Sequence, residues 1–234
     1  MELSITPYST LMAVDPSLTC SGWALFDIKE ECVIGVGKIK APKPPIPLQE
    51  RLLQVHYRVE SLFKKVKLGK NSVLVCEEAT SIKDPHSTFK VEQVRGIFEC
   101  AARYNNVCVP GRINPRSVQT DLLGMGSGRQ LTRNAVKEAA RSFVSTVYND
   151  QLEKIGFNTD KEALASNQDI VDAILLGALA LSYIKAASLS RESLYSVFNA
   201  SKRKRRSSRK GWGKGEEISF GWSYREVASL GRKK

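Results

Sequence analysis

The sequence has few of the residues that build zinc sites, disulfide frameworks and histidine-based active sites. Among 234 residues there are five cysteines and two histidines, and no two cysteines have Cys-x-x-Cys spacing. The odd cysteine count and the apolar neighbours of most of these cysteines indicate buried free thiols in a reducing compartment. With only His56 and His86 available, a Ser-His-Asp triad or a histidine-ligated metal is disfavoured.

The sequence also lacks segments that direct a chain into a membrane. The N-terminal ten residues contain no basic stretch followed by an apolar one, so no signal peptide is expected. The longest apolar run, residues 173–181, is too short to span a bilayer, and Asp172 precedes it. We therefore expect a soluble intracellular protein without a membrane partner. It would be cytoplasmic or nucleoid-associated, or lie in the host cytoplasm if the source is a virus.

Acidic residues are outnumbered, 24 against 36 Lys and Arg, which gives a formal net charge of +12. Residues 191–234 hold 13 of the basic residues and four acids, so +9 of this charge belongs to the C-terminal part. Such a charge favours a polyanionic partner, and the basic run at 201–215 has no apolar periodicity. We expect a folded domain at 1–187 and a flexible, basic tail at 188–234 that binds DNA. Tail contacts are expected from Lys202, Arg203, Lys204, Arg205 and Arg206.

Hydrophobic patterning predicts an α/β fold. Apolar runs at 10–15, 22–29 and 32–40 are joined by connections too short for a helix, so they should form an antiparallel meander. Further strands are expected at 72–77 and 106–110. Helices are expected at 48–66, 88–104, 115–123, 131–148 and 168–187, and residues 149–166 should be loop. Strand–helix alternation after an antiparallel start predicts a mixed sheet with helices packed on it.

Acidic residues lie where predicted strands end and where a predicted helix begins. Asp15 and the pair Glu77 and Glu78 end strands, and Asp169 and Asp172 share one face of the last helix. Strand alternation lets only one of the two glutamates face the other acids, and the sequence does not say which. Alone, Asp15 could start a turn and Asp169 could cap the helix. Together these acids favour a hard-oxygen site for Mg²⁺ or Mn²⁺, where two ions about 3.5–4 Å apart can hydrolyse a phosphodiester.

Several segments, in this order, resemble the RuvC-type Holliday-junction resolvases of the ribonuclease H-like superfamily. The resemblance covers residues 10–187 and leaves a basic C-terminal extension, which marks the chain as divergent. The matching segments are residues 12–25 (MAVDPSLTCSGWAL), the strand VLVCE that ends at Glu77, Gln93-Val94-Arg95-Gly96, residues 115–118 (PRSV), Gly124-Met125-Gly126 and Asp169-Ile170-Val171-Asp172-Ala173.

This resemblance implies a five-stranded ribonuclease H-like sheet, antiparallel over its first three strands and parallel afterwards, flanked by helices. It implies a homodimeric, Mg²⁺-dependent endonuclease that resolves four-way DNA junctions by paired nicking, with two ions per site and Mn²⁺ as a substitute. The acids carried over by position are Asp15, Glu77, Asp169 and Asp172, as catalytic and metal-binding residues. DNA contacts are expected from Arg112, Arg116, Arg129 and Arg133. Where bacterial members carry a junction-stacking aromatic, this chain has Thr80, and Phe89 lies further on and is expected to face the core.

Other function classes remain open. A broader branched-DNA or flap nuclease, or a nuclease for RNA–DNA hybrids, would use the same acids. A non-catalytic DNA-binding protein on the same fold is disfavoured, because a pure binder has no reason to gather carboxylates near phosphates. A sugar-kinase-like or actin-like phosphotransferase is disfavoured because the chain is too short for two domains and Ser17 replaces the glycine of the Asp-x-Gly-Thr opening.

Overall fold

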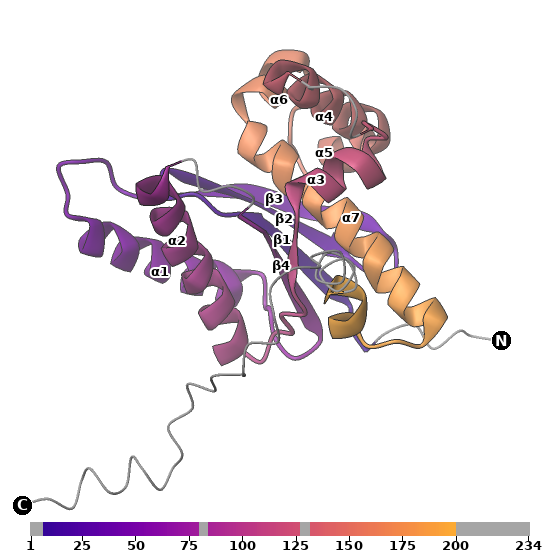
Figure 1. The fold of residues 1–234 in the computed structure, drawn as a ribbon, viewed down its shortest axis with the longest axis horizontal. Helices are drawn as coiled ribbons and strands as arrows, with labels where there is room; N and C mark the ends of the chain where they lie inside the picture. Colours follow the sequence, from indigo (N-terminus) through magenta and orange to yellow (C-terminus); the bar gives the residue numbers. More distant parts are fainter. Residues whose placement is uncertain (1–6, 80–83, 127–131, 200–234) are drawn as a thin grey trace, which may run out of the picture. The chain divides into compact units, whose positions relative to one another are not determined.

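The computed structural model describes residues 7–79, 84–126 and 132–199 (Figure 1). Three parts of the sequence-based prediction therefore lie outside the described residues. They are Thr80, Arg129 and the basic run at 202–206.

A five-stranded mixed sheet forms the centre of the fold, with the order β3-β2-β1-β4-β5. β1 (Thr10–Asp15), β2 (Cys20–Asp27) and β3 (Cys32–Lys40) form the antiparallel meander that the sequence predicts. β4 (Ser72–Glu77) runs parallel to β1, and β5 (Arg112–Ile113) runs parallel to β4. The predicted α/β class and strand pattern are thus confirmed.

The predicted position of the fifth strand, residues 106–110, is wrong. That segment makes one isolated bridge, between Val73 and Cys108, and the ladder resumes only at β5. Pro110 lies between the two pieces, and proline has no N–H to donate to a ladder. The apolar run therefore packs beside β4 without forming a regular strand.

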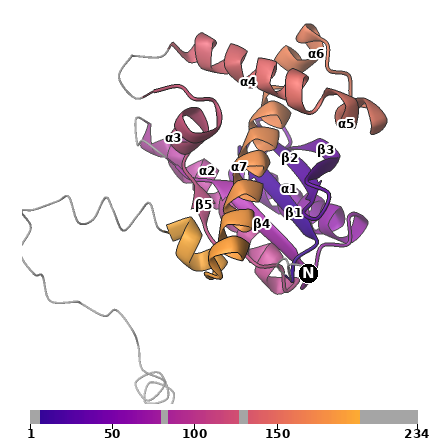
Figure 2. The ribbon, with the colours of Figure 1, turned by 90° about the vertical axis from the view of Figure 1, so that its right-hand side faces the viewer.

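Helices cover both faces of the sheet, because alternate residues of each strand point to opposite faces. α1 (Leu48–Lys65) and α2 (Pro85–Tyr104) pack on the face that carries Met12, Val14 and Leu74. The other face, which carries Leu11 and Phe26, is covered by α7 (Gln168–Ser190) (Figures 1 and 2). Among the described residues, α7 is long and apolar enough to cross a membrane by length and composition, but most of its apolar residues are buried in this core.

Short helices connect β5 to α7. They are α3 (Pro115–Ser117), the π-helical turn η1 (Val118–Leu122), α4 (Arg133–Val147), α5 (Asn149–Lys154) and α6 (Lys161–Ser166). Figure 2 shows α4, α5 and α6 grouped around the start of α7. The prediction of loop at 149–166 is wrong, because α5 and α6 each bury one leucine, Leu152 and Leu164, in an otherwise polar stretch.

The folded core extends beyond the predicted boundary at residue 187. α7 continues to Ser190, and the segment 194–199 is helical and packs back on the core. Leu194 and Phe198 are buried, and the Phe198 ring meets Tyr183 edge to face at 5.3 Å between centroids. The described core therefore reaches at least to Asn199.

Candidate active site

The four predicted acids come together at one edge of the sheet. β1 and β4 are parallel neighbours with Val14 paired to Cys76, so Asp15 and Glu77 leave the sheet side by side at their carboxyl ends. α7 begins at the same edge and brings Asp169 and Asp172 there from its first turns. The Asp172 carboxylate is oriented by its own helix, since Gln168 Nε2 donates a 2.8 Å hydrogen bond to its Oδ1.

Residues of β2 and β3 hold the start of α7 in place. Gly22 on β2 lies directly beneath the main chain of Asp169. The Cys20 thiol hydrogen-bonds the Asp169 carboxylate, and burial followed by this contact raises the pKa of Cys20 to about 11. Lys38 Nζ donates to the Ser166 carbonyl at 3.1 Å and lies 3.8 Å from Asp169 Oδ2. Lys38 was not among the residues predicted from the sequence.

Burial and mutual repulsion raise the pKa values of three of these acids. The pKa of Asp15 is raised well above its usual value, first by burial and then by Glu77, Asp172 and Asp169. Burial, with a contribution from Asp172, raises the pKa of Glu77 to about 7. The pKa of Asp172 is raised mainly by burial. Glu77 is thus in electrostatic contact with Asp15 and Asp172.

The chemistry of this donor set fits a divalent cation. All four groups offer carboxylate oxygens, the ligands that Mg²⁺ and Mn²⁺ prefer, and a cation would relieve their repulsion. Within the described residues, no three His, Cys, Asp or Glu side chains form a group close enough to enclose a metal ion as they stand. Binding would therefore require these side chains to move closer together.

Arg95, on α2, is a buried positive charge next to the acids. Its side chain is 1% exposed, and it lowers the pKa values of both Asp15 and Glu77 against the effect of burial. Nη1 of Arg95 donates to Glu92, whereas its Nε has no hydrogen-bond partner among the described residues. From the sequence, Arg95 was recognised only as part of a motif. In the structure its neighbours on the inner face of α2, Val94 and Phe98, are buried with it.

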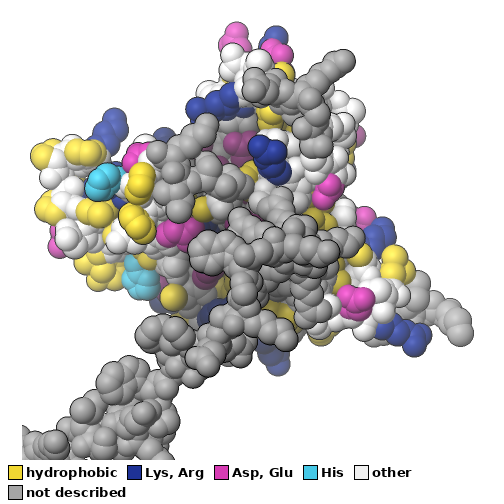
Figure 3. Space-filling view, viewed as in Figure 1, with side chains coloured by type: hydrophobic (Ala, Val, Ile, Leu, Met, Phe, Trp, Pro, Cys, Tyr) yellow, Lys and Arg dark blue, Asp and Glu magenta, His cyan; other side chains and the backbone are white. Residues whose placement is uncertain are grey.

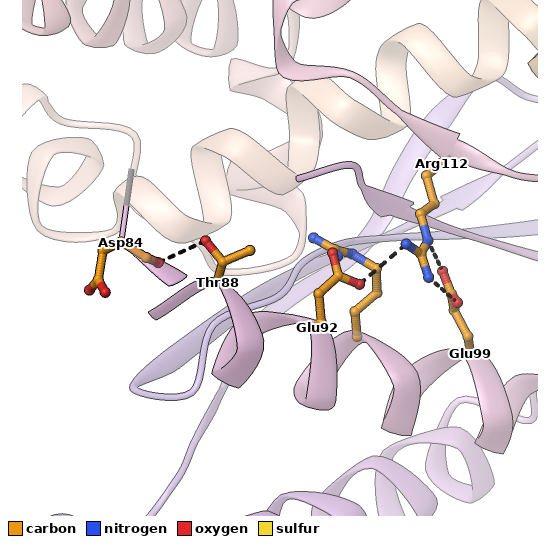
Figure 4. A network of polar contacts seen from close by, with 6 residues as sticks. Asp84, Thr88, Glu92, Glu99 and Arg112 are labelled. Atoms are coloured by element: carbon orange, nitrogen blue, oxygen red, sulfur yellow. Dashed lines mark hydrogen bonds and ion pairs between the residues drawn. The ribbon is translucent and has the colours of Figure 1, made fainter. Parts of the chain in front are cut away.

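Arg112, which was predicted to contact DNA, takes part in a network of charged side chains along α2 (Figure 4). Its Nε and Nη2 donate to both carboxylate oxygens of Glu99 at 2.7 and 2.9 Å, and its Nη1 donates to Glu92 at 3.3 Å. At the start of the same helix, Thr88 donates to the Asp84 carbonyl at 2.9 Å. The guanidinium of Arg112 is thus already bound within the protein, and its contact with DNA stays a prediction.

A cleft of about 370 Å³ opens beside the acids, between β4, η1, α4 and α7. Glu77 and Asp172 line this cleft together with two cations of α4, Arg133 and Lys137. Both cations lower the pKa of Asp172, Lys137 more than Arg133. Arg133 was predicted from the sequence but Lys137 was not, although a spacing of four residues on a helix places the two on one face.

Two other predicted residues lie outside this cleft lining. Arg116 is exposed on α3, where the Asn114 side chain caps the helix by accepting from the Arg116 N–H at 2.9 Å. Phe89 was expected to face the core, and this is wrong, because its side chain on α2 is 67% exposed. Phe89 precedes the buried Phe98 by nine residues, which at 3.6 residues per turn places it on the opposite side of the helix.

Comparison with known proteins identifies the fold. No protein-family profile and no curated protein sequence matches the chain. The Thermus thermophilus RuvC structure aligns with a TM-score of 0.57 and 17% identity over 76% of this chain and 97% of that protein. The structure of T. thermophilus RuvC in complex with Holliday junction substrate aligns with a TM-score of 0.55 and 16% identity, over 77% of this chain and 98% of that protein. The yeast mitochondrial Holliday junction resolvase Ydc2 aligns with a TM-score of 0.47 and 12% identity, over 86% of each chain. The two Thermus thermophilus alignments show that this chain has the fold of RuvC.

Proposed function

We propose that this protein is a metal-dependent endonuclease that resolves four-way DNA junctions by paired nicking. The observation that carries the proposal is the convergence of Asp15, Glu77, Asp169 and Asp172 from three separate elements at one edge of a RuvC-like sheet. Burial and mutual repulsion raise the pKa values of these carboxylates, and charged carboxylates in such surroundings lower the stability of the fold. Their presence together at one site therefore supports a role in catalysis.

Each residue has a distinct task in this proposal. The four acids would hold Mg²⁺ or Mn²⁺, two ions per site, which would activate a water and stabilise the leaving oxygen of a phosphodiester. Arg95 limits the repulsion between Asp15 and Glu77. Gln168 fixes the Asp172 carboxylate, and Arg133 and Lys137 offer positive charge to a phosphate in the cleft.

Cleavage of defined substrates tests the proposal. Four-way junctions, forks, flaps, RNA–DNA hybrids and linear duplex are each incubated with the protein in Mg²⁺, Mn²⁺ or EDTA. We expect symmetric nicks on the junction that require metal and are abolished by Asp169→Asn, whereas Asp150→Asn on the exposed surface of α5 leaves them unchanged. Cleavage mainly of flaps or hybrids would support the broader nuclease instead. Junction binding without any cleavage would support a non-catalytic DNA-binding protein.

We also propose that the active form is a homodimer, since paired nicks on a two-fold symmetric junction need two sites and the chain has one. The surface offered for a second copy is the α1–α2 patch, a shallow apolar groove lined by Leu52, Leu53, Gly96, Ile97 and Cys100. Leu53 is 40% exposed there, and the neighbouring Tyr57 is 57% exposed. Figure 3 shows hydrophobic side chains gathered over this end of the molecule.

The mass in solution checks the homodimer. Leu53→Asp should convert a dimer to a monomer and leave the junction nicked on one strand at a time. Leu189→Asp replaces another exposed leucine, at 69% exposure on α7, and should keep the dimer. A wild-type monomer that still makes paired incisions would contradict this part of the proposal.

The basic tail is proposed to add affinity for DNA without setting specificity. Because residues 188–199 belong to the folded core, the informative truncation removes residues 200–234 rather than 188–234. The truncated protein should bind junctions more weakly and with a flatter salt dependence, while metal-dependent cleavage persists at higher enzyme concentration. Unchanged affinity at every salt concentration would contradict a role in binding.

A further inference from the structure

A second basic surface lies near the acids and shares no lining residue with the cleft. It is a groove of about 560 Å³ between the turn after β1, the end of β3 and the start of α2. Three lysines from three separate segments line it: Lys40 ends β3, Lys43 lies in the proline-rich connection to α1, and Lys90 lies on α2. The groove lining also has hydroxyl groups and no acidic side chain among the described residues. We call this surface the Lys40 groove.

The three ammonium groups are available to a ligand. All three lysines are exposed, and none makes a side-chain ion pair or hydrogen bond to another described residue. The three lysines line one groove with no acidic side chain among its described lining residues, so their like charges repel one another there. Their repulsion would be relieved by several anionic oxygens spaced along its length.

Local contacts give the groove a fixed backbone. Arg51 on α1 also lines it, and its Nε donates to the Pro42 carbonyl at 2.7 Å, which anchors the connection that carries Lys43. On the other wall, the main-chain N–H of Ser17 donates to the Ser21 hydroxyl at 2.9 Å, and that hydroxyl donates to the Ser17 carbonyl at 2.8 Å. The lysines therefore project from a framework that is built before any ligand binds.

The Lys40 groove adjoins the candidate active site. Cys20 lines the groove, and its thiol hydrogen-bonds the Asp169 carboxylate. The turn that supplies Ser17 and Thr19 follows Asp15 directly. Glu77 and Asp172 line the cleft that holds Arg133 and Lys137, so positively charged surfaces adjoin the acids both there and in the Lys40 groove.

We propose that the Lys40 groove binds the sugar-phosphate backbone of a DNA arm where it leaves the acidic site. This inference rests on the proposed nuclease function and adds a path for DNA that was not expected from the sequence. A single phosphate group needs converging donors, whereas three lysines spread along an open groove suit successive phosphates of a strand. Contacts of this kind position DNA without reading its sequence.

The test compares two triple variants with equal loss of charge. One is Lys40→Ala/Lys43→Ala/Lys90→Ala. The matched control is Lys29→Ala/Lys65→Ala/Lys70→Ala, which removes three exposed lysines near the other edge of the sheet, where β1 and β4 begin. Binding of a fluorescent four-way junction is measured by anisotropy in EDTA at several salt concentrations, and single-turnover cleavage is measured in Mg²⁺.

The groove variant should bind the junction about 10–100-fold more weakly than the wild-type protein. The slope of its log affinity against log salt concentration should be smaller in magnitude by about 2–3, since each phosphate that is no longer neutralised accounts for roughly 0.9. At saturating enzyme it should still cleave, since the acids are intact. The control should keep the wild-type slope.

Three outcomes would overturn the inference. If the wild-type protein binds and cleaves junctions but the two triple variants bind them equally well, the proposal for the Lys40 groove alone is wrong. A wild-type protein that does not bind DNA would overturn the groove and the proposed function together. Competition by polyglutamate as strong as by DNA would indicate an acidic protein partner in place of a DNA arm.

Discussion

A Cβ atom on Gly22 would lie 1.9 Å from the main-chain oxygen of Asp169. This distance is far inside van der Waals contact, so only glycine lets the start of α7 rest on β2. A second glycine, Gly177, allows the same close approach further along, where a Cβ would lie 2.0 Å from the Phe26 ring. The two contacts fix both the distance of α7 from the sheet and the position of its acids.

Replacement of Gly22 by alanine should therefore displace the acids of α7. We expect Gly22→Ala to lower the free energy of unfolding by about 1–3 kcal/mol, the usual cost of overpacking, and to reduce metal-dependent cleavage more than stability alone explains. Gly35→Ala on β3 is the matched control, because its Cβ would meet only ordinary contacts at 3.7 Å or more. Denaturant unfolding and single-turnover cleavage at a temperature where both variants are folded measure the two effects. Equal activity of both variants would contradict a positioning role for Gly22.

The acids should destabilise the metal-free protein above neutral pH. Folding raises the pKa of Glu77 from 4.5 to about 7, so the folded state holds a proton there that the unfolded chain loses between these pH values. As the pH rises through this window, the folded state is penalised relative to the unfolded one. Glu77→Gln removes the penalty, and in EDTA it should increase the free energy of unfolding by about 1–3 kcal/mol at pH 8 and by little at pH 4.5.

Denaturant unfolding in EDTA at the two pH values measures this effect. Glu138→Gln, at an exposed position on α4, is the control and should show no such difference between pH 4.5 and pH 8. Added Mg²⁺ should stabilise the wild-type protein more than Glu77→Gln, because the variant loses a proposed ligand. If Glu77→Gln increases the free energy of unfolding equally at both pH values, ionisation of Glu77 does not destabilise the folded state.

The ends of β1 and β4 could be predicted from the sequence because they follow a simple rule. Apolar runs that finish in an acid, in parallel neighbouring strands, place Asp15 and Glu77 at one edge. The inward orientation of Arg95 and the pairing of Arg112 could not be predicted, since a charged residue on a helix is usually solvated. Arg112 on β5 is held by Glu92 and Glu99 of α2, a contact that depends on how the two elements pack, whereas Arg95 pairs with Glu92 on its own helix but is turned inward by the packing of α2. Tertiary contacts of this kind leave no periodic signal in the sequence.

Arg112 should contribute to stability more than to DNA affinity. Its two hydrogen bonds to Glu99 form a bidentate pair, and a partly exposed pair of this geometry is worth about 1 kcal/mol. A double-mutant cycle of Arg112→Ala and Glu99→Gln should give a coupling energy of this size in denaturant unfolding. Arg116→Ala, which removes an exposed arginine, is expected to weaken junction binding without changing stability. Additive effects on stability, with an affinity loss for Arg112→Ala equal to that of Arg116→Ala, would assign Arg112 to the DNA surface instead.

Lys137 should matter for cleavage because it lines the same cleft as Asp172. It is the cation that most lowers the pKa of Asp172, and its ammonium makes no ion pair within the described residues. A charge held this near the acids can stabilise the negative charge that develops on a phosphate during hydrolysis. Lys137→Ala should therefore slow single-turnover cleavage of a junction by at least about tenfold, with partial recovery in Lys137→Arg. Lys154→Ala, at an exposed position on α5, should cleave at the wild-type rate. Rates for Lys137→Ala within about twofold of this control would exclude Lys137 from the reaction and leave Arg133 as the cation of the cleft.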